Sequence, residues 1–233
     1  MKNESGAAPA LIEGIAAACA AEPAHEIIVV DDGSTDGTAD VVLGLRGRFP
    51  QLRVLRHDRS GGQSAAVHSG VLAARGRVIC TLDGDGQNPP SELPKLFTPL
   101  LADETGRLGL VAGQRVARQD TLSKRLASRF ANGLRARILR DGTRDTGCGL
   151  KGFRRDAFLR LPFFNHMHRY LPALFKRDGW QVALVDVAHR ERAAGSSNYS
   201  NLQRALVGIV DLAGVAWLIR RRKQATPAEV TPE

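Results

Sequence analysis

The sequence predicts an α/β protein whose mostly parallel sheet is covered by helices on both faces. Apolar runs with the length of buried strands alternate with helical patterns, and two of these runs end in acidic, glycine-bearing turns. The 233 residues suffice for one domain with a substantial core, and the composition of 43% hydrophobic and 24% charged residues is ordinary for a globular protein. We therefore expect one catalytic-sized domain.

The expected elements follow from two periodicities. Each strand is predicted from a short apolar run bounded by turn residues, and each helix from apolar positions that recur at helical spacing. A proline near its start favours the first helix. Expected helices cover residues 9–21, 38–46, 63–74, 92–101, 122–139 and 168–177, expected strands cover 26–30, 52–55, 77–82, 108–112 and 180–187, and 142–152 is expected to be irregular.

The first acidic strand end has the sequence DDGSTDGT over residues 31–38, directly after the apolar run 27–30. An open α/β sheet places its ligand at this edge, where a carboxylate such as Asp32 can accept hydrogen bonds from a base or ribose. A helix N-cap by Ser34 or Asp36, with glycines for turn geometry, explains the same residues. Taken alone, this motif leaves both interpretations open.

The second acidic strand end has the sequence DGDGQNPP over residues 83–90. Asp83 and Asp85 alternate in sequence and can reach one divalent cation, and Gln87 is spaced to add a neutral oxygen. Short Asp-x-Asp strings are frequent in surface turns. Directly after a buried strand, however, two unpaired carboxylates are unfavourable without a cation. The motif predicts an Mg²⁺ or Mn²⁺ site that also takes pyrophosphate oxygens.

The formal charge of +9 is unevenly distributed. Residues 115–160 contain thirteen Lys/Arg and four Asp, so this segment alone accounts for the whole net charge and is expected to face an anion. Few aromatic residues interleave with it, which disfavours nucleic acid and favours a phosphate-bearing ligand or an acidic membrane surface. Cys19, Cys80 and Cys148 lack disulfide or zinc spacing, and no signal peptide is visible, so we expect a reduced, cytoplasmic protein.

The longest apolar run covers residues 205–219, is interrupted by Asp211 and is followed by the basic residues 220–223. It is short of the about 20 residues that span a bilayer. It suits a helix at the inner face of the cytoplasmic membrane, or equally a helix packed on the core. The expected organisation is a catalytic domain over 1–200, a basic amphipathic helix over 201–224 and a disordered tail over 225–233.

In this order the motifs resemble the inverting family 2 glycosyltransferases, most closely the branch of dolichyl-phosphate mannose synthases and bacterial polyprenyl-phosphate glycosyltransferases. The resemblance implies a GT-A fold that holds a nucleotide-diphosphate sugar across the strand ends. Relatives begin with a hydrophobic strand, so we expect the first strand to be missing, a sheet edge to be exposed and the numbered sequence to begin downstream of the true start. The matching stretches are 3–4, 31–38, 83–90, 113–115, 145–149, 151–155, 168–170 and 192–199.

The resemblance also implies roles for individual residues. Asp32 would contact the nucleoside, and Arg115 would meet a phosphate. Metal ligands would be Asp83, Asp85 and Gln87; further donor-side residues Glu4, Ser34 and Asp36; acceptor-side residues Arg129, Ser197 and Tyr199; catalytic residues Asp85, Arg115 and Arg192; and weaker phosphate contacts Lys124 and Ser128.

The implied reaction moves a sugar from a nucleotide-diphosphate sugar to a polyprenyl phosphate, with inversion and with a divalent metal. A phosphate monoester is largely dianionic at neutral pH, so it needs charge neutralisation more than a general base. One alternative is a transferase of the same fold that acts on a saccharide hydroxyl in cell-envelope polysaccharide synthesis, for which Asp145 is the nearest candidate base. The other is a non-catalytic nucleotide-sugar-binding protein.

Overall fold

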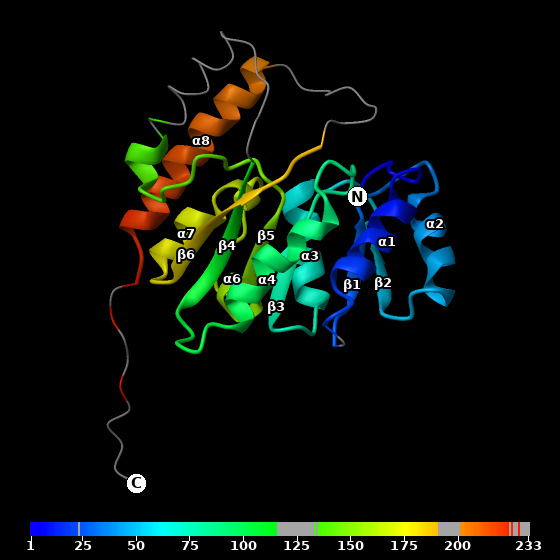
Figure 1. Ribbon diagram of the computed structural model, residues 1–233. Coiled ribbons are helices and arrows are strands. Elements are labelled where there is room, and N and C mark those ends of the chain that lie inside the picture. The colour runs from blue at the N-terminus through cyan, green and yellow to red at the C-terminus, as the bar shows by residue number, and fades with distance from the viewer. Residues whose placement is uncertain are drawn as a thin grey trace.

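The computed structural model describes residues 1–22, 24–115, 133, 135–190, 201–223, 225 and 228, with only the backbone of 201–206 (Figure 1). Within this range the expected helices and strands are confirmed to within a few residues, whereas the expected helix over 122–139 lies mostly outside the described residues. The helices are α1 (Ala8–Ala18), α2 (Thr38–Gly44), α3 (Gln63–Ala73), α4 (Leu93–Leu101), α6 (Arg155–Leu159), α7 (Leu171–Arg177) and α8 (Asn201–Arg220), with short 3-10 turns at Leu45–Gly47, Pro90–Glu92 and Met167–Arg169. The strands are β1 (Ile27–Asp31), β2 (Leu52–Arg56), β3 (Val78–Thr81), β4 (Leu108–Arg115), β5 (Lys151–Arg154) and β6 (Gln181–Val187).

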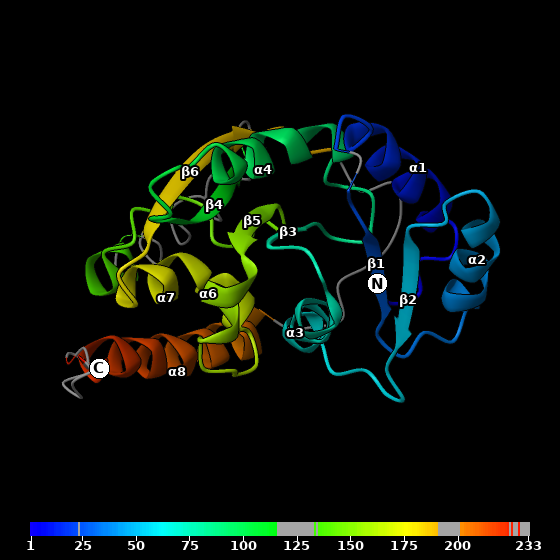
Figure 2. The ribbon, with the colours of Figure 1, turned by 90° about the horizontal axis from the view of Figure 1, so that it is seen from below.

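The strands form two sheets. β1 and β2 pair in parallel, and the second sheet has the order β3-β5-β4-β6. In the second sheet β4 and β6 are parallel, whereas β5 runs antiparallel to both β3 and β4. Helices cover both faces, with α1 and α4 on one side and α3, α6 and α7 on the other (Figure 2). The described strands thus differ from the expected mostly parallel sheet in two ways: they form two sheets, and the inner strand β5 is antiparallel to both of its neighbours.

The sequence conceals β5 because its glycine reads as part of an irregular loop. A Cβ at Gly152 would lie 2.8 Å from the backbone oxygen of Leu96 on α4, so the glycine lets the helix backbone approach the strand. On its other side Phe153 is fully buried and stacks on Phe158 of α6, with ring centroids 4.9 Å apart. The close contact with α4 therefore determines that residue 152 is a glycine, and local strand propensity does not.

Helix α8 packs on the domain with one face and exposes the other. Val215 is 1% exposed and lies in the main core cluster, against which Leu212 and Leu218 also pack. On the opposite face Val210 is 71% exposed and Trp217 is 59% exposed. Among the described residues no helix is long and apolar enough to cross a bilayer. Packing on the core is therefore confirmed for one face of α8, whereas membrane contact by the exposed face and the separation of this helix from a 1–200 domain stay predictions.

Candidate functional site

The carboxylate of Asp83 lies just beyond β3 in a socket of polar groups. Gln63 Nε2, at the start of α3, donates to Asp83 Oδ1 at 2.6 Å, and Asn88 Nδ2 donates to Oδ2 at 3.1 Å. Burial raises the pKa of the Asp83 carboxyl above its usual range, and the charge of Asp85 raises it further. The site therefore concentrates negative charge that the surrounding groups only partly compensate.

The loop before β5 forms the other wall of this socket. A Cβ at Gly149 would clash with the Asp83 carboxylate, so this position admits the acid only because it has no side chain. Thr81 Oγ1 fixes the loop by donating to the Gly149 carbonyl at 2.9 Å. Lys151 is buried beneath it and donates to the Cys148 carbonyl, and its charge favours the ionised form of Asp83.

These residues fit a divalent cation with few protein ligands. The Asp83 and Asp85 carboxylates are coupled electrostatically, and a dication compensates a pair of close acids better than protonation does at neutral pH. The described residues contain no group of three or more His, Cys, Asp or Glu that could hold a metal, so other positions would go to phosphate oxygens and water. The backbone of Gln87 donates to Asp85 Oδ1 at 3.1 Å, and a metal-ligand role for its side chain stays a prediction.

Asp32 lies at the end of β1 and has a different environment. Its oxygens accept from Gly61 N at 2.8 Å, Gly62 N at 2.9 Å and Ser60 Oγ at 2.8 Å, and lie 2.7 Å from His57 Nδ1. Burial alone would raise the pKa of Asp32, but these hydrogen bonds outweigh it and lower the pKa to about 2. Asp32 therefore holds the turn that starts α3, and nucleoside contact by this residue stays a prediction.

The remaining donor-side candidates join two segments near the N-terminus. Asp36 Oδ2 accepts from Ser5 N at 3.0 Å, and Asp36 Oδ1 accepts from Thr38. Ser34 Oγ accepts from Asn3 N at 2.9 Å, and Glu4 N donates to Thr38 Oγ1 at 3.0 Å. The structure thus places Glu4, Ser34 and Asp36 together, and the hydrogen bonds from Thr38 and Ser5 lower the pKa of Asp36.

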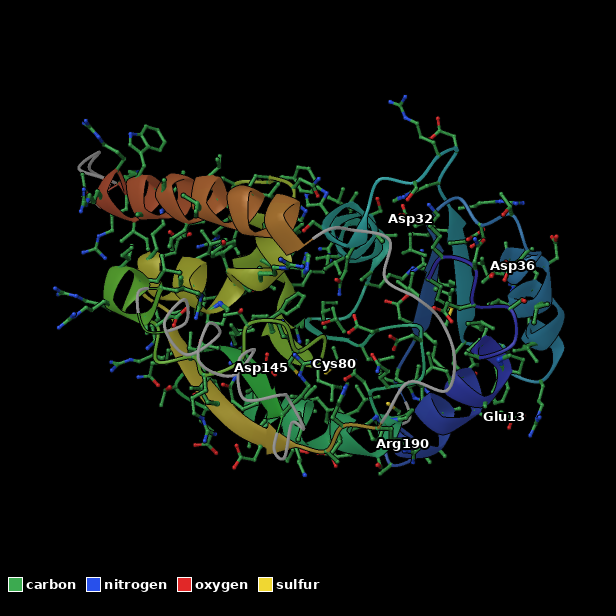
Figure 3. The ribbon with its side chains drawn as sticks, turned by 90° about the horizontal axis from the view of Figure 1, so that it is seen from above. Glu13, Asp32, Asp36, Cys80, Asp145 and Arg190 are labelled. Carbon is green, nitrogen blue, oxygen red and sulfur yellow. The ribbon has the colours of Figure 1, made fainter. Side chains whose placement is uncertain are left out.

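Arg115 and Asp145 form a two-point ion pair at the end of β4. Arg115 Nε lies 2.5 Å from Asp145 Oδ2, and Nη2 lies 2.9 Å from Oδ1. The hydrogen bonds that Arg115 donates to Asp145 raise the pKa of Arg115. Figure 3 shows Asp145 in the part of the molecule that carries the four-stranded sheet, and Asp32 on the side of β1 and β2. The guanidinium stays cationic, and the carboxylate is engaged as an ion-pair partner.

The other acceptor and catalytic candidates lie outside the described residues. They are Lys124, Ser128, Arg129, Arg192, Ser197 and Tyr199. They fall in the two stretches that follow Arg115 and Arg190. Arg190, labelled in Figure 3, donates from its backbone N to the Gln87 carbonyl at 2.9 Å. The segment that leads to Arg192 therefore starts beside the Asp83–Asp85 motif, while the roles of these six residues stay predictions.

Several basic residues of the segment 115–160 serve the fold. Arg154 Nη2 pairs with Asp103 at 3.1 Å, and Arg155 Nε donates to the Val71 carbonyl at 3.0 Å. These contacts tie β5 and α6 to neighbouring elements. The expectation that the segment faces an external anion as a whole is thus wrong for these residues, because the sequence does not reveal which cations find internal partners.

Sequence reasoning missed the groups that shape the Asp83 site. Gln63, Asn88 and Lys151 surround this acid, and His57 contacts Asp32. The Gly61-Gly62 turn was the feature of the sequence that could have indicated Gln63. A helix that starts in a loop facing the ligand directs its first side chains towards the ligand. Lys151 lies in the matching stretch 151–155, but its burial beside Asp83 was not predicted, since a lysine in a basic segment ordinarily faces solvent.

The fold and the strand-end carboxylates define the chain as an α/β domain of the GT-A type. The chain belongs to glycosyl transferase family 2, whose family model matches residues 1–161. The solved structure of glucosyl-3-phosphoglycerate synthase from Mycobacterium tuberculosis, in complex with Mn²⁺ and UDP-glucose, has a TM-score of 0.68 at 20% identity over 96% of this chain and 78% of that one. This likeness confirms the expected GT-A fold.

Two relatives match most of the chain. Dodecaprenyl-phosphate galacturonate synthase from Rhizobium johnstonii is 36% identical over 231 residues, which is 94% of this chain. Undecaprenyl-phosphate 4-deoxy-4-formamido-L-arabinose transferase from Photorhabdus laumondii is 32% identical over 203 residues, which is 85% of this chain. The chain spans 65% and 60% of the length of these relatives.

His168 provides a pH-dependent measure of this site's packing. Its Nδ1 lies 2.7 Å from Ser64 Oγ, and burial, then the Lys151 charge, lowers its pKa to about 3. Between pH about 6.5 and 3, His168 binds a proton in the unfolded chain but not in the folded chain. The free energy of unfolding therefore falls as the pH falls through this window. We predict that the free energy of unfolding of the wild type, relative to His168→Gln, decreases by up to about 1.4 kcal/mol per pH unit there.

Denaturant unfolding of both proteins between pH 7 and 4 measures this difference. Carboxylate titrations are common to both chains and cancel in the comparison. A difference that does not vary with pH would contradict a buried, neutral His168.

Proposed function

We propose that this chain transfers a sugar from a nucleotide-diphosphate sugar to a polyprenyl phosphate, with inversion at the anomeric carbon. The observation that carries the proposal is the partly buried Asp83 carboxylate, which Gln63 and Asn88 hold at the end of β3 beside Asp85. The names of the two relatives, a dodecaprenyl-phosphate synthase and an undecaprenyl-phosphate transferase, support the acceptor class. The membership of this chain in glycosyl transferase family 2 supports transferase chemistry.

Asp83 and Asp85 would hold Mg²⁺ or Mn²⁺ at the diphosphate of the donor. The ion, when bound, neutralises charge on the departing nucleoside diphosphate. The complex of the Mycobacterium tuberculosis synthase with Mn²⁺ and UDP-glucose supports this assignment by fold. Gln63 and Asn88 would keep the Asp83 oxygens oriented while the donor enters and leaves.

The ion pair at Asp145 favours a phosphate acceptor over a hydroxyl acceptor. A hydroxyl must lose a proton, and a carboxylate that accepts two hydrogen bonds from Arg115 is a poor base, because its ionised form is stabilised. A phosphate monoester attacks as a dianion without such help. Arg115 would remain available on the cationic side of the pair to face a phosphate oxygen.

Helix α8 would place the acceptor site at a membrane surface. Its exposed apolar face, defined by Val207, Val210 and Trp217, leads into the basic residues 220–223. Anionic lipid phosphates attract such a basic end. Two hydrogen bonds, His166 Nδ1 to Asp211 Oδ2 at 3.0 Å and Tyr170 to Gly208 at 3.4 Å, join α8 to the 166–170 segment.

That segment leads from the helix towards the site. His168 lies on it and contacts Ser64, the neighbour of Gln63 on α3, and Gln63 donates to Asp83. A lipid phosphate held near α8 would therefore approach the carboxylate pair without the lipid leaving the membrane. This arrangement supports a peripheral location at the inner face of the cytoplasmic membrane.

We predict that Asp83→Asn and Asp85→Asn each lower kcat/KM by about 100-fold or more, because each removes a charge that holds the cation. The assay offers a panel of UDP- and GDP-sugars with undecaprenyl phosphate and measures the nucleoside diphosphate released. Asp156→Asn, at a solvent-exposed position of α6, is the matched control and should retain full activity.

Full activity in EDTA, or full activity of both Asp83→Asn and Asp85→Asn, would contradict a role for a divalent metal in the reaction. Transfer to a saccharide with none to undecaprenyl phosphate would instead select the hydroxyl-acceptor reaction. Donor binding by calorimetry, without turnover on any acceptor, would select a binding protein.

We predict that Trp217→Glu weakens binding to vesicles rich in phosphatidylglycerol by about tenfold or more, since the buried apolar area is lost and a like charge is added. Val41→Glu, which changes an exposed valine on α2, is the control and should bind as the wild type does. Vesicle co-sedimentation measures both. Equal binding by the two variants would show that this face of α8 does not meet the membrane.

A further inference from the structure

Gln114 is an uncharged polar residue that is buried near the end of β4. It is 1% exposed and lies between Gly113 and Arg115 in the strand. A buried side-chain amide has to satisfy an N–H₂ donor group and a carbonyl acceptor within the protein. The partners of this amide therefore indicate what the residue does.

Both ends of the amide contact the loop that carries Asp145. Gln114 Oε1 accepts from Arg144 N at 2.8 Å and from Asp145 N at 3.0 Å. Gln114 Nε2 donates to the Gly113 carbonyl at 2.9 Å and to the Asp145 carbonyl at 3.4 Å. One side chain thus holds the backbone of Asp145 on both sides of its Cα atom.

These contacts favour glutamine over other residues at position 114. Two consecutive backbone N–H groups converge on Oε1, an arrangement that in other proteins binds anions. An ionised glutamate would also accept from them, but it has no N–H to donate to the carbonyls of Gly113 and Asp145. A neutral amide is therefore the side chain that matches all four partners.

The carboxylate of Asp145 is held by the next residue of the strand. Arg115 donates to both of its oxygens, from Nε at 2.5 Å and from Nη2 at 2.9 Å. Asp145 Oδ1 also accepts from Gly147 N at 3.0 Å. Two consecutive residues of β4 therefore fix one acid, Gln114 through its backbone and Arg115 through its carboxylate.

The loop packs closely against the end of β4. A Cβ at Gly147 would lie 3.1 Å from Arg115 Nη2, and a Cβ at Gly113 would lie 3.0 Å from the Leu150 carbonyl oxygen. Gly113 N donates to the same carbonyl at 2.9 Å. Because the loop has little room to move along the strand, the anchor at its backbone determines where the Asp145 carboxylate lies.

The orientation of the Arg115 guanidinium matters because this cation interacts with the Asp83 site. The hydrogen bonds to Asp145 raise the pKa of Arg115, and the charge of Asp83 raises it further. A planar guanidinium that binds a carboxylate through two nitrogen atoms has a fixed orientation. The position of Asp145 therefore sets how the Arg115 cation is directed relative to Asp83.

We propose that Gln114 is a positioning residue for sugar transfer: its amide fixes the Asp145 backbone, and Asp145 in turn holds Arg115 in place for the acceptor phosphate. The role of the acceptor rests on the proposed function, whereas the positioning of Arg115 does not. Gln114 acts through Asp145 and Arg115. Its loss is expected to loosen the ion pair while the two sheets stay folded.

Proton exchange at Arg115 Nε measures this positioning without any substrate. The signal is observed by ¹H–¹⁵N nuclear magnetic resonance and is identified by its absence in Arg115→Lys. Gln114→Met keeps the length of the side chain and removes its hydrogen bonds, so we expect this proton to exchange with water about tenfold faster. Gln181→Met, the same substitution at an exposed glutamine of β6, is the matched control and should exchange as the wild type does.

A second variant covers the case in which Gln114→Met does not fold. Gln114→Asn keeps an amide but is one methylene shorter, so it cannot reach both N–H groups and should also exchange faster. Unchanged exchange in both variants would overturn the proposal. Loss of the dispersed amide spectrum in both variants would overturn it as well, because Gln114 would then hold the fold and not the ion pair.

Steady-state kinetics test the consequence for the acceptor, with the UDP- or GDP-sugar that supports transfer. Gln114→Met should raise the KM for undecaprenyl phosphate by about tenfold and change the KM for the donor by less than about twofold. In an Asp145→Asn background the same substitution should have no further effect, because the ion pair is already weakened.

An equal rise in both KM values, or additive effects of the two substitutions, would contradict a positioning role. A wild-type protein that transfers sugar to no acceptor would refute the proposed function, and the exchange experiment would still decide whether Gln114 positions Arg115.

Discussion

The structure depends on one constraint: a carboxylate that is partly buried at the end of β3 without a full counter-charge. Asp83 enters this position because Gly149 has no side chain, and Gln63 and Asn88 hold its two oxygens. Burial and the nearby Asp85 charge raise its pKa, so the site favours an added positive charge. The loop before β5, the start of α3 and the end of β3 all meet at this group.

The two acidic strand ends look alike in sequence and differ in electrostatics. Asp32 receives donors on both oxygens, and its pKa falls to about 2. Asp83 receives fewer donors, and desolvation together with the charge of Asp85 raises its pKa. Asp32 therefore stabilises the turn that begins α3. This turn positions Gln63, which donates to Asp83. The contacts of Asp32 thus support, through this turn, the position of the Asp83 carboxylate.

Sequence periodicity was enough for the order of most helices and strands, because α1, β1, α4 and β4 each bury a regular apolar pattern. It failed at β5, where a glycine needed for contact with α4 resembles loop sequence. For the site, the motif predicted the pair Asp83 and Asp85 because two alternate acids directly after a buried strand are unfavourable without a cation. They could not predict the Arg115–Asp145 pair or the position of Lys151, since these contacts join segments far apart in the chain.

The central claim is that Asp83 and Asp85 together bind a divalent cation. Titration of the protein with Mn²⁺ in the presence of UDP or GDP, followed by electron paramagnetic resonance of the free ion, measures this without any acceptor. The account predicts one bound ion per chain, lost in Asp83→Asn and Asp85→Asn and retained in Asp156→Asn. Equal Mn²⁺ binding by all four proteins would contradict it.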